Sequence, residues 1–216
     1  MKQYLFFALN LLLALEGTSQ AKGDYMWQIG QNSHPQENPY ALSMVLDFNV
    51  LGINLDTFYR GMKMGYFNAS ISDVDGKLLV YSNGCQIKNG DHSNIPETMS
   101  LSPGETDFEW CLSNPSSGYP KFEGGLFISF FSDSIILLLH QRDYVLSNPT
   151  RIITDSLFYS SVQRDGDQYV LHEKTVPIVG DNLTDGNVEA VKASKPGAWW
   201  VIQGEKNSNR YFSILL

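Results

Sequence analysis

The chain has 216 residues, of which 43% are hydrophobic and 18% charged, with 15 Lys plus Arg against 23 Asp plus Glu for a net charge of -8. This acidic balance, with no Lys/Arg run, argues against nucleic acid or an anionic membrane as the main partner, because the necessary cations are missing. Twelve Phe, eleven Tyr and four Trp supply enough apolar area for a folded core, which argues against disorder.

Residues 1–21 indicate a secretory signal peptide. Lys2 supplies the positive start, Leu5–Leu15 the apolar stretch, and Ser19-Gln20-Ala21 a cleavage site between small residues. The apolar run is about eleven residues long, well below the roughly 20 that span a bilayer, which disfavours a membrane anchor. We therefore expect a mature protein of residues 22–216 that is secreted or displayed at the cell surface, with no membrane span after cleavage.

Residues 22–216 predict an all-β fold, because turn-forming residues punctuate the chain and no window shows apolar residues at helical spacing. In the first of four expected hairpins, Asp75-Gly76 supplies the positive φ of a tight turn. The long polar segments Gln31–Pro39 and Asn83–Thr106 are expected to be surface loops. The four hairpins are Tyr66–Ser82, Leu126–His140, Leu157–Leu171 and Ala198–Leu216.

The apolar stretch Leu126–Leu139 is interrupted by Ser129 and by Ser132-Asp133-Ser134. It is too short and too polar for a membrane span. Two strands joined at Ser132–Ser134 account for it better, since a strand covered on both faces of a packed sheet is almost continuously apolar.

The spacing of the hairpins favours a β-propeller-like domain. Their turns centre near residues 76, 133, 166 and 206. That is one to two hairpins per roughly 40 to 60 residues, a loose repetition that suits propeller blades. The chain also stops at Leu216 inside an apolar strand, so we expect a partial propeller of about three blades that is incomplete at its C-terminus. A β-sandwich is the alternative.

Several distinct segments follow one another along Gly65–Leu216. The first is Asn68–Gly84, the next group is Gly118–Pro120 with Glu123–Leu126 and Asp133–His140, and the last group is Asn187–Lys192 with Trp199–Ile202 and Asn207–Leu216. In this order they resemble a family of secreted proteins from Bacteroidota (Bacteroidetes). The resemblance implies an N-terminal β-propeller-like region and usually a C-terminal sorting domain for type IX secretion. No sorting domain is present here, so type IX secretion is implied only for a longer chain. The family provides no catalytic residues to carry over.

Cys85 and Cys111 are the only cysteines. In an exported chain they are an obvious disulfide pair, which would pin the long polar segment by restricting the unfolded state. Two buried, reduced cysteines are the alternative. No cofactor is expected, since the chain has no Gly-rich phosphate loop. No metal site is expected either, because no C-x-x-C motif occurs and no local zinc motif uses the spacings of His34, His92, His140 and His172.

Asp73-Val74-Asp75-Gly76 resembles part of a calcium-binding loop, in which alternating carboxylates supply oxygen ligands. An EF-hand would require a glutamate at position 82, which is Ser82. A turn in which Asp75-Gly76 supplies only backbone geometry is therefore favoured.

An acidic stretch lies near the second cysteine, on its N-terminal side. A glycosidase needs two carboxylates with unequal pKa values, and Glu105 and Glu109 are the candidates for acid and base. Solvated loop acids are the favoured alternative. The stretch comprises Glu97, Glu105, Asp107 and Glu109.

Trp199 and Trp200 stand side by side in the last expected hairpin. Flat aromatic rings pair with the apolar faces of sugars, so the two form a candidate ligand platform, with core packing as the favoured alternative. Adjacent residues of a strand point to opposite faces, which leaves at most one of them for any given pocket.

The sequence as a whole predicts a non-catalytic secreted or cell-surface module for adhesion or for binding of a glycan or an extracellular protein. One alternative is an exported polysaccharide hydrolase that uses loop carboxylates. Another is a structural domain that presents other modules of a longer chain.

Overall fold

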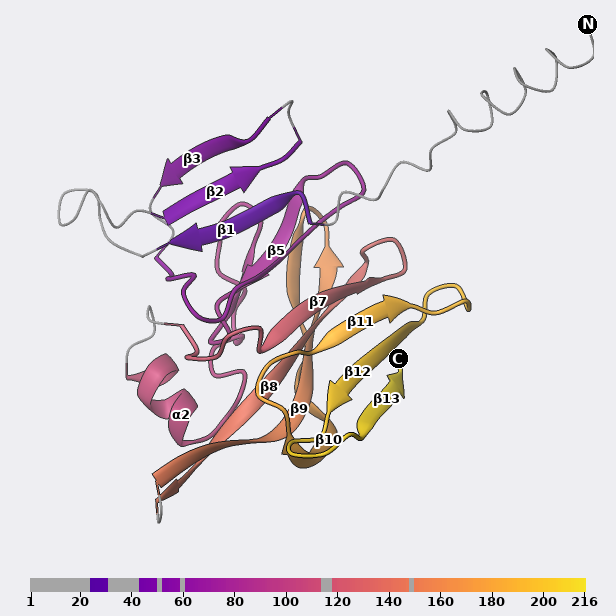
Figure 1. Cartoon of the computed structure of the whole chain (residues 1–216). Helices are drawn as coiled ribbons and strands as arrows, with labels where there is room; N and C mark the ends of the chain where they lie inside the picture. The colour runs from indigo at the N-terminus through magenta and orange to yellow at the C-terminus, as the bar shows by residue number, and fades with distance from the viewer. Residues whose placement is uncertain (1–23, 31–42, 50–51, 59–60, 114–117, 148–149) are drawn as a thin grey trace, which may run out of the picture.

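The computed structural model describes residues 24–30, 43–49, 52–58, 61–113, 118–147 and 150–216. The fold of these residues is all-β, as the sequence predicts: four antiparallel sheets and one short helical segment (Figure 1). The predicted signal peptide and the predicted loop Gln31–Pro39 lie outside the described residues. No helix in the described ranges is both long enough and apolar enough to cross a bilayer.

The first two sheets each contain three strands that follow one another in the chain. Ser70 Oγ on β4 donates a hydrogen bond to the Met26 carbonyl oxygen on β1 (2.8 Å), which ties the two sheets together. The first sheet consists of β1 (Met26–Gly30), β2 (Ser43–Asp47) and β3 (Asn54–Phe58), and the second of β4 (Ala69–Ser72), β5 (Leu78–Ser82) and β6 (Ile87–Asn89).

The third and fourth sheets are built in the same consecutive way, with strand orders β10-β9-β8-β7 and β11-β12-β13. The four predicted hairpins are confirmed as the antiparallel pairs β4–β5, β7–β8, β9–β10 and β12–β13. The bounds are β7 (Gly125–Phe130), β8 (Ile135–Ser147), β9 (Thr150–Asp165), β10 (Gln168–Leu183), β11 (Glu189–Lys192), β12 (Trp199–Gly204) and β13 (Tyr211–Leu215).

The turn between β4 and β5 shows how local residues set a hairpin. Gly76 has φ 87°, the positive value predicted for it. Asp73 Oδ1 accepts hydrogen bonds from the N–H groups of Asp75 (3.0 Å) and Lys77 (2.9 Å). The carboxylate that resembled a calcium ligand therefore closes its own turn.

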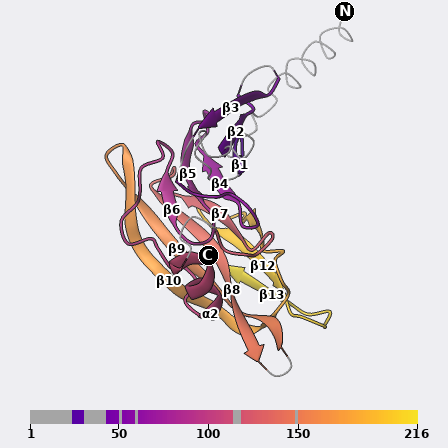
Figure 2. The same ribbon diagram turned by 90° about the vertical axis from the view of Figure 1, so that its left-hand side faces the viewer.

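The third sheet is covered on both faces. Ile136 and Leu138 point into the core shared with the second sheet, whereas Leu139 and the partly buried Leu137 point into the core shared with the fourth. This arrangement confirms the interpretation of Leu126–Leu139 as strands buried from two sides. Figure 2 shows the first sheet at one end of the molecule and the fourth beside the long strands of the third.

None of the four described sheets closes on itself, and a propeller is not confirmed. The number of sheets also exceeds the expected three or so blades. In addition, β8, β9 and β10 run for 13, 16 and 16 residues, well beyond the predicted hairpins. Their outer halves mix polar and apolar residues without a clear alternation, so pairing with the neighbouring strand, rather than local pattern, sets their length.

The expectation of a surface loop at Asn83–Thr106 is wrong, because much of this segment is buried. Ile87, Ile95 and Leu101 belong to the core between the second and third sheets. Thr98 Oγ1 donates to the Ile95 carbonyl oxygen (2.8 Å) and accepts the Ile87 N–H (3.2 Å). Polar side chains here satisfy buried backbone groups, so a composition typical of loops occurs inside the protein.

One helical segment was not expected from the sequence: α2 (Glu105–Asp107), which continues as a π-helical turn, η1 (Phe108–Leu112). It is too short to show an apolar period.

Farther along, buried amides join the third sheet to the fourth. Gln141 Nε2 on β8 donates to Gln203 Oε1 on β12 (2.7 Å), and Gln141 Oε1 accepts the Gly186 N–H (2.9 Å).

Candidate functional site

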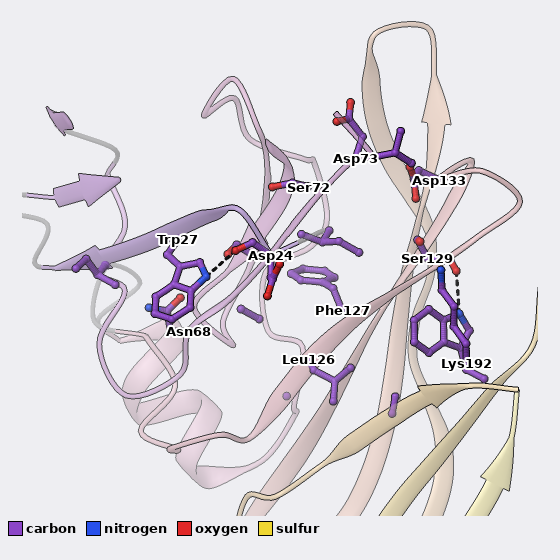
Figure 3. Close-up of a pocket in the computed structure, with 18 residues that line it drawn as sticks. Asp24, Trp27, Asn68, Ser72, Asp73, Leu126, Phe127, Ser129, Asp133 and Lys192 are labelled. Atoms are coloured by element: carbon purple, nitrogen blue, oxygen red, sulfur yellow. Dashed lines mark hydrogen bonds between the residues drawn. The ribbon is translucent and has the colours of Figure 1, made fainter. Parts of the chain in front are cut away.

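A cleft with a volume of about 1020 Å³ opens where the four sheets meet. Its walls come from the start of β1, from β4 and β7 with the turns that follow them, and from β11 and the beginning of β12. Figure 3 shows Leu126 and Phe127 of β7 between Trp27 on one side and Lys192 on the other. Every sheet thus contributes side chains to one site.

Two tryptophans of the cleft are held by their indole N–H groups. Trp27 Nε1 donates to the Asp24 carbonyl oxygen (2.7 Å), and Trp199 Nε1 donates to the Ser129 carbonyl oxygen (2.9 Å). Trp27 remains 49% exposed. The Lys192 ammonium lies 5.6 Å from the centre of the Trp199 ring, within cation–π range. Both rings therefore have fixed orientations before any ligand arrives.

The charged groups of the cleft are mostly carboxylates. Asp24, Asp73 and Asp133 line it together with one cation, Lys192. Figure 3 shows Asp73 and Asp133, from the turns after β4 and β7, at the same rim. Carboxylate oxygens are strong hydrogen-bond acceptors, so this rim suits a ligand that carries several hydroxyl or amino donors.

The predicted platform of Trp199 and Trp200 is divided between two faces of β12. Trp199 lines the cleft, whereas Trp200 lies between Val191 and Leu215 in the strand register and is 40% exposed. This is the alternation expected of neighbouring strand residues. Trp27 and Phe127 line the same cleft as Trp199. The sequence did not predict this meeting, because no local signal links β1 or β7 to β12.

The proposed hydrolytic carboxylates lie away from the cleft. Glu105 and Glu109 are exposed on α2 and η1, and neither lines the cleft. Asp107 between them is buried, and this burial raises the pKa of its carboxyl despite a hydrogen bond from Ser100 Oγ (2.5 Å). Glu97 is exposed on the preceding segment. The acidic stretch thus supplies no carboxylate to the cleft.

Cys85 and Cys111 are joined in a disulfide with their Cα atoms 5.2 Å apart, and both side chains are fully buried. The bond anchors η1 to the end of the second sheet.

Beside the disulfide, the exposed Trp110 ring packs edge-on against Tyr66 (centroids 6.5 Å apart), and Tyr66 packs against Phe122 (4.9 Å). This aromatic cluster was not predicted, because its members come from three separate segments.

His140 is a buried histidine whose contacts are those of a structural residue. Ser102 Oγ is 2.9 Å from Nδ1, Ser160 Oγ is 2.9 Å from Nε2, and the ring stacks on Phe158. Complete burial lowers the pKa of His140 to about 3, so the imidazole is neutral at physiological pH. Among the described residues, no group of three or more His, Cys, Asp or Glu side chains is arranged to hold a metal ion.

Comparison of the chain with protein-family models, curated proteins and solved structures found no match. The resemblance to secreted Bacteroidota proteins therefore stays a prediction.

Proposed function

We propose that the protein is a non-catalytic extracellular binding module that holds a glycan in the cleft where its four sheets meet. The observation that carries this proposal is the pair Trp27 and Trp199, whose rings are anchored by hydrogen bonds and line one cleft. Aromatic faces stack on sugar rings, and fixed rings lose little entropy when a ligand binds.

The polar groups of the cleft complement this stacking. Phe127 and Leu126 provide apolar surface between Trp27 and Lys192 (Figure 3), while Asp73 and Asp133 offer acceptors for sugar hydroxyls at the rim. The cleft combines apolar and polar lining in similar proportion, and ligand sites commonly use apolar surface for contact and convergent polar groups for orientation. With three carboxylates and one ammonium, the cleft favours neutral or amino sugars over uronic acids.

The disulfide and the predicted leader support the extracellular location that we propose. A buried disulfide persists in oxidising surroundings, which supports secretion or display at the cell surface. The apolar stretch at residues 5–15 supports export through a signal peptide. The composition and acidity fit the same location and give no support to nucleic-acid binding.

For the fold we propose a propeller-like arrangement of the four described sheets without closure. Each sheet is an up-and-down meander completed before the next begins, and the second, third and fourth sheets share successive cores. Consecutive meanders in face-to-face contact are the arrangement of propeller blades. The face-to-face packing equally fits stacked β-sandwich layers, which is the alternative form of the proposal.

The test is glycan binding by the mature protein and three tryptophan variants. A panel of neutral, amino and acidic oligosaccharides is screened on an array, and the best ligand is measured by isothermal titration calorimetry. We expect Trp27→Ala and Trp199→Ala each to weaken binding by at least about fivefold, as loss of a ligand-contacting aromatic residue does. Trp200→Ala is the matched control and should leave Kd unchanged, since its ring faces away from the cleft.

Equal losses in Trp199→Ala and Trp200→Ala would contradict the assignment of the cleft, as would binding that survives both cleft variants. Assays of the same mixtures for released reducing ends test the hydrolase alternative. Reducing ends released by wild-type protein and lost in Glu105→Ala or Glu109→Ala would replace the binding proposal with an enzymatic one.

A further inference from the structure

Lys121 is a buried lysine held between two carboxylates. Its side chain is 1% exposed and contacts the carboxylate of Asp143, itself 6% exposed. Asp185 Oδ1 lies 2.7 Å from the same Nζ, and Thr154 Oγ1 lies 2.8 Å from it. The amine and the Asp143 carboxylate therefore meet in a place that water scarcely reaches.

Three features of the chain hold the Asp143 carboxylate in position. A register shift between Arg142 and Asp143 places Asp143 opposite Thr154 in the β8–β9 pair, and such irregularities commonly re-aim a side chain. Thr154 Oγ1 donates to Asp143 Oδ1 (3.1 Å). The Asp143 backbone N–H donates to the hydroxyl oxygen of Tyr119 (2.9 Å).

Lys121 is confined as closely as its partner. A Cβ at Gly124 would come within 2.6 Å of Lys121 Cγ and Cδ, so the glycine leaves room for the lysine stem. The amine is held among Asp143, Thr154 and Asp185, and Asp143 is the buried carboxylate of the two. Reacting groups held in contact with few other conformations have a very high effective concentration.

Two buried charges in contact carry a large desolvation penalty, which only excellent geometry offsets. Condensation to an amide removes both charges and releases one water molecule. We infer that Lys121 and Asp143 are joined by an intramolecular isopeptide bond between Nζ and Cγ. This inference is independent of the cleft and its ligand.

The step balances without an oxidant, reductant or cofactor. One proton of the Lys121 ammonium is transferred to the Asp143 carboxylate, because an ionised carboxylate resists nucleophilic attack, and the nitrogen lone pair then attacks Cγ of Asp143 to form the new C–N bond. A C–O bond of Asp143 then breaks, and the oxygen leaves as water with the two protons that the ammonium has given up. Asp185, 2.7 Å from Nζ and 70% exposed, is placed to accept the second proton and return it to the departing oxygen.

Asp143 rather than Asp185 is the acyl partner, because the structure buries and orients it. Asp185 is open to solvent, where its carboxylate is stabilised by hydration and poorly disposed to nucleophilic attack. Thr154 is a positioning residue that keeps the Asp143 carboxylate next to the amine. The resulting bond would fasten the segment before β7 to β8 in a way that reducing agents do not undo.

The test is peptide mapping of the full-length protein under reducing conditions. We expect a branched tryptic peptide that contains Lys121 and Asp143, lighter by one water than the sum of its parts and uncleaved after Lys121. The Lys121→Arg variant keeps the positive charge, cannot form this amide, and should yield two linear peptides. In Asp143→Asn the same amide would form with loss of ammonia instead of water, so the branched peptide would have the same mass as in wild type but would be lighter by one ammonia than the sum of its unlinked parts.

Water loss alone is insufficient proof, since an aspartate followed by glycine, such as Asp185-Gly186, loses water when it cyclises to a succinimide. A dehydrated linear peptide over Asp185-Gly186, with Lys121 free, would overturn the inference. Intact linear peptides around Lys121 and Asp143 in wild-type protein would overturn it too. If Lys121→Arg fails to fold, the wild-type map still decides. Asp185→Asn should slow formation of the branched peptide in freshly expressed protein, and an unchanged rate would remove Asp185 from the mechanism.

Discussion

Removal of the Cys85–Cys111 disulfide is expected to lower the free energy of unfolding by about 3.5 kcal/mol. The two cysteines are separated by 26 residues. In the chain-entropy description, a loop of this length restricts the unfolded state by about 12 cal/mol/K, which is about 3.5 kcal/mol at 25 °C. For a domain of this size the melting temperature should fall by about 7–14 °C.

Urea unfolding followed by tryptophan fluorescence measures this effect in three samples: oxidised wild type, wild type reduced in place, and the double variant Cys85→Ala/Cys111→Ala. The reduced wild type keeps both sulfur atoms, so it isolates loop closure. The double variant also leaves small cavities in the core between the second and third sheets, where both side chains are buried. We expect it to lose about a further 1 kcal/mol.

The slope of unfolding free energy against urea should rise on reduction, because an unfolded chain without the cross-link exposes more surface. A difference between oxidised and reduced wild type below about 1 kcal/mol, with an unchanged slope, would refute the loop-closure reasoning. It would mean that the segment between the cysteines keeps its structure when the rest of the chain unfolds.

Two further predictions concern a buried histidine and a crowded glycine. The folded pKa of His140 is about 3 against an ordinary 6.5, so below pH 6.5 the unfolded chain binds a proton that the folded chain excludes. The stability that the neutral histidine contributes is therefore complete above pH 6.5 and is lost as the pH falls toward 3. Over this range the urea midpoint should decline less steeply in His140→Gln than in wild type. Parallel declines in the two proteins would contradict the assignment. Gly125→Ala would place a Cβ 2.3 Å from the Leu139 carbonyl oxygen and 2.5 Å from the Phe67 ring. We expect Gly125→Ala to lower the free energy of unfolding, measured by heat or urea, by about 2–4 kcal/mol. The control in a strand is Gly180→Ala, whose new Cβ meets nothing within 4 Å and which should cost about 0.5 kcal/mol or less. Equal effects of the two substitutions would show that the contacts at Gly125 relax without cost.

Local features of the sequence were sufficient to predict the hairpins. Asp75-Gly76 predicted a positive φ at a tight turn, and the structure has that turn. The apolar stretch Leu126–Leu139 predicted strands that are buried on two faces, and its side chains pack into two cores. Such features depend on backbone sterics and on the side-chain period of a strand, which operate within a few residues. They failed at Asn83–Thr106, where polar side chains satisfy backbone groups inside the core.

What the sequence by itself determined is the all-β class, the four hairpins and the division of Trp199 and Trp200 between two faces of one strand. Only the tertiary structure decided that Trp27 shares a cleft with Trp199, and that Lys121 meets Asp143. These encounters join residues from different sheets or from segments that lie apart in the chain. They are fixed by the packing of whole sheets against one another, a long-range property that no local pattern of residues encodes.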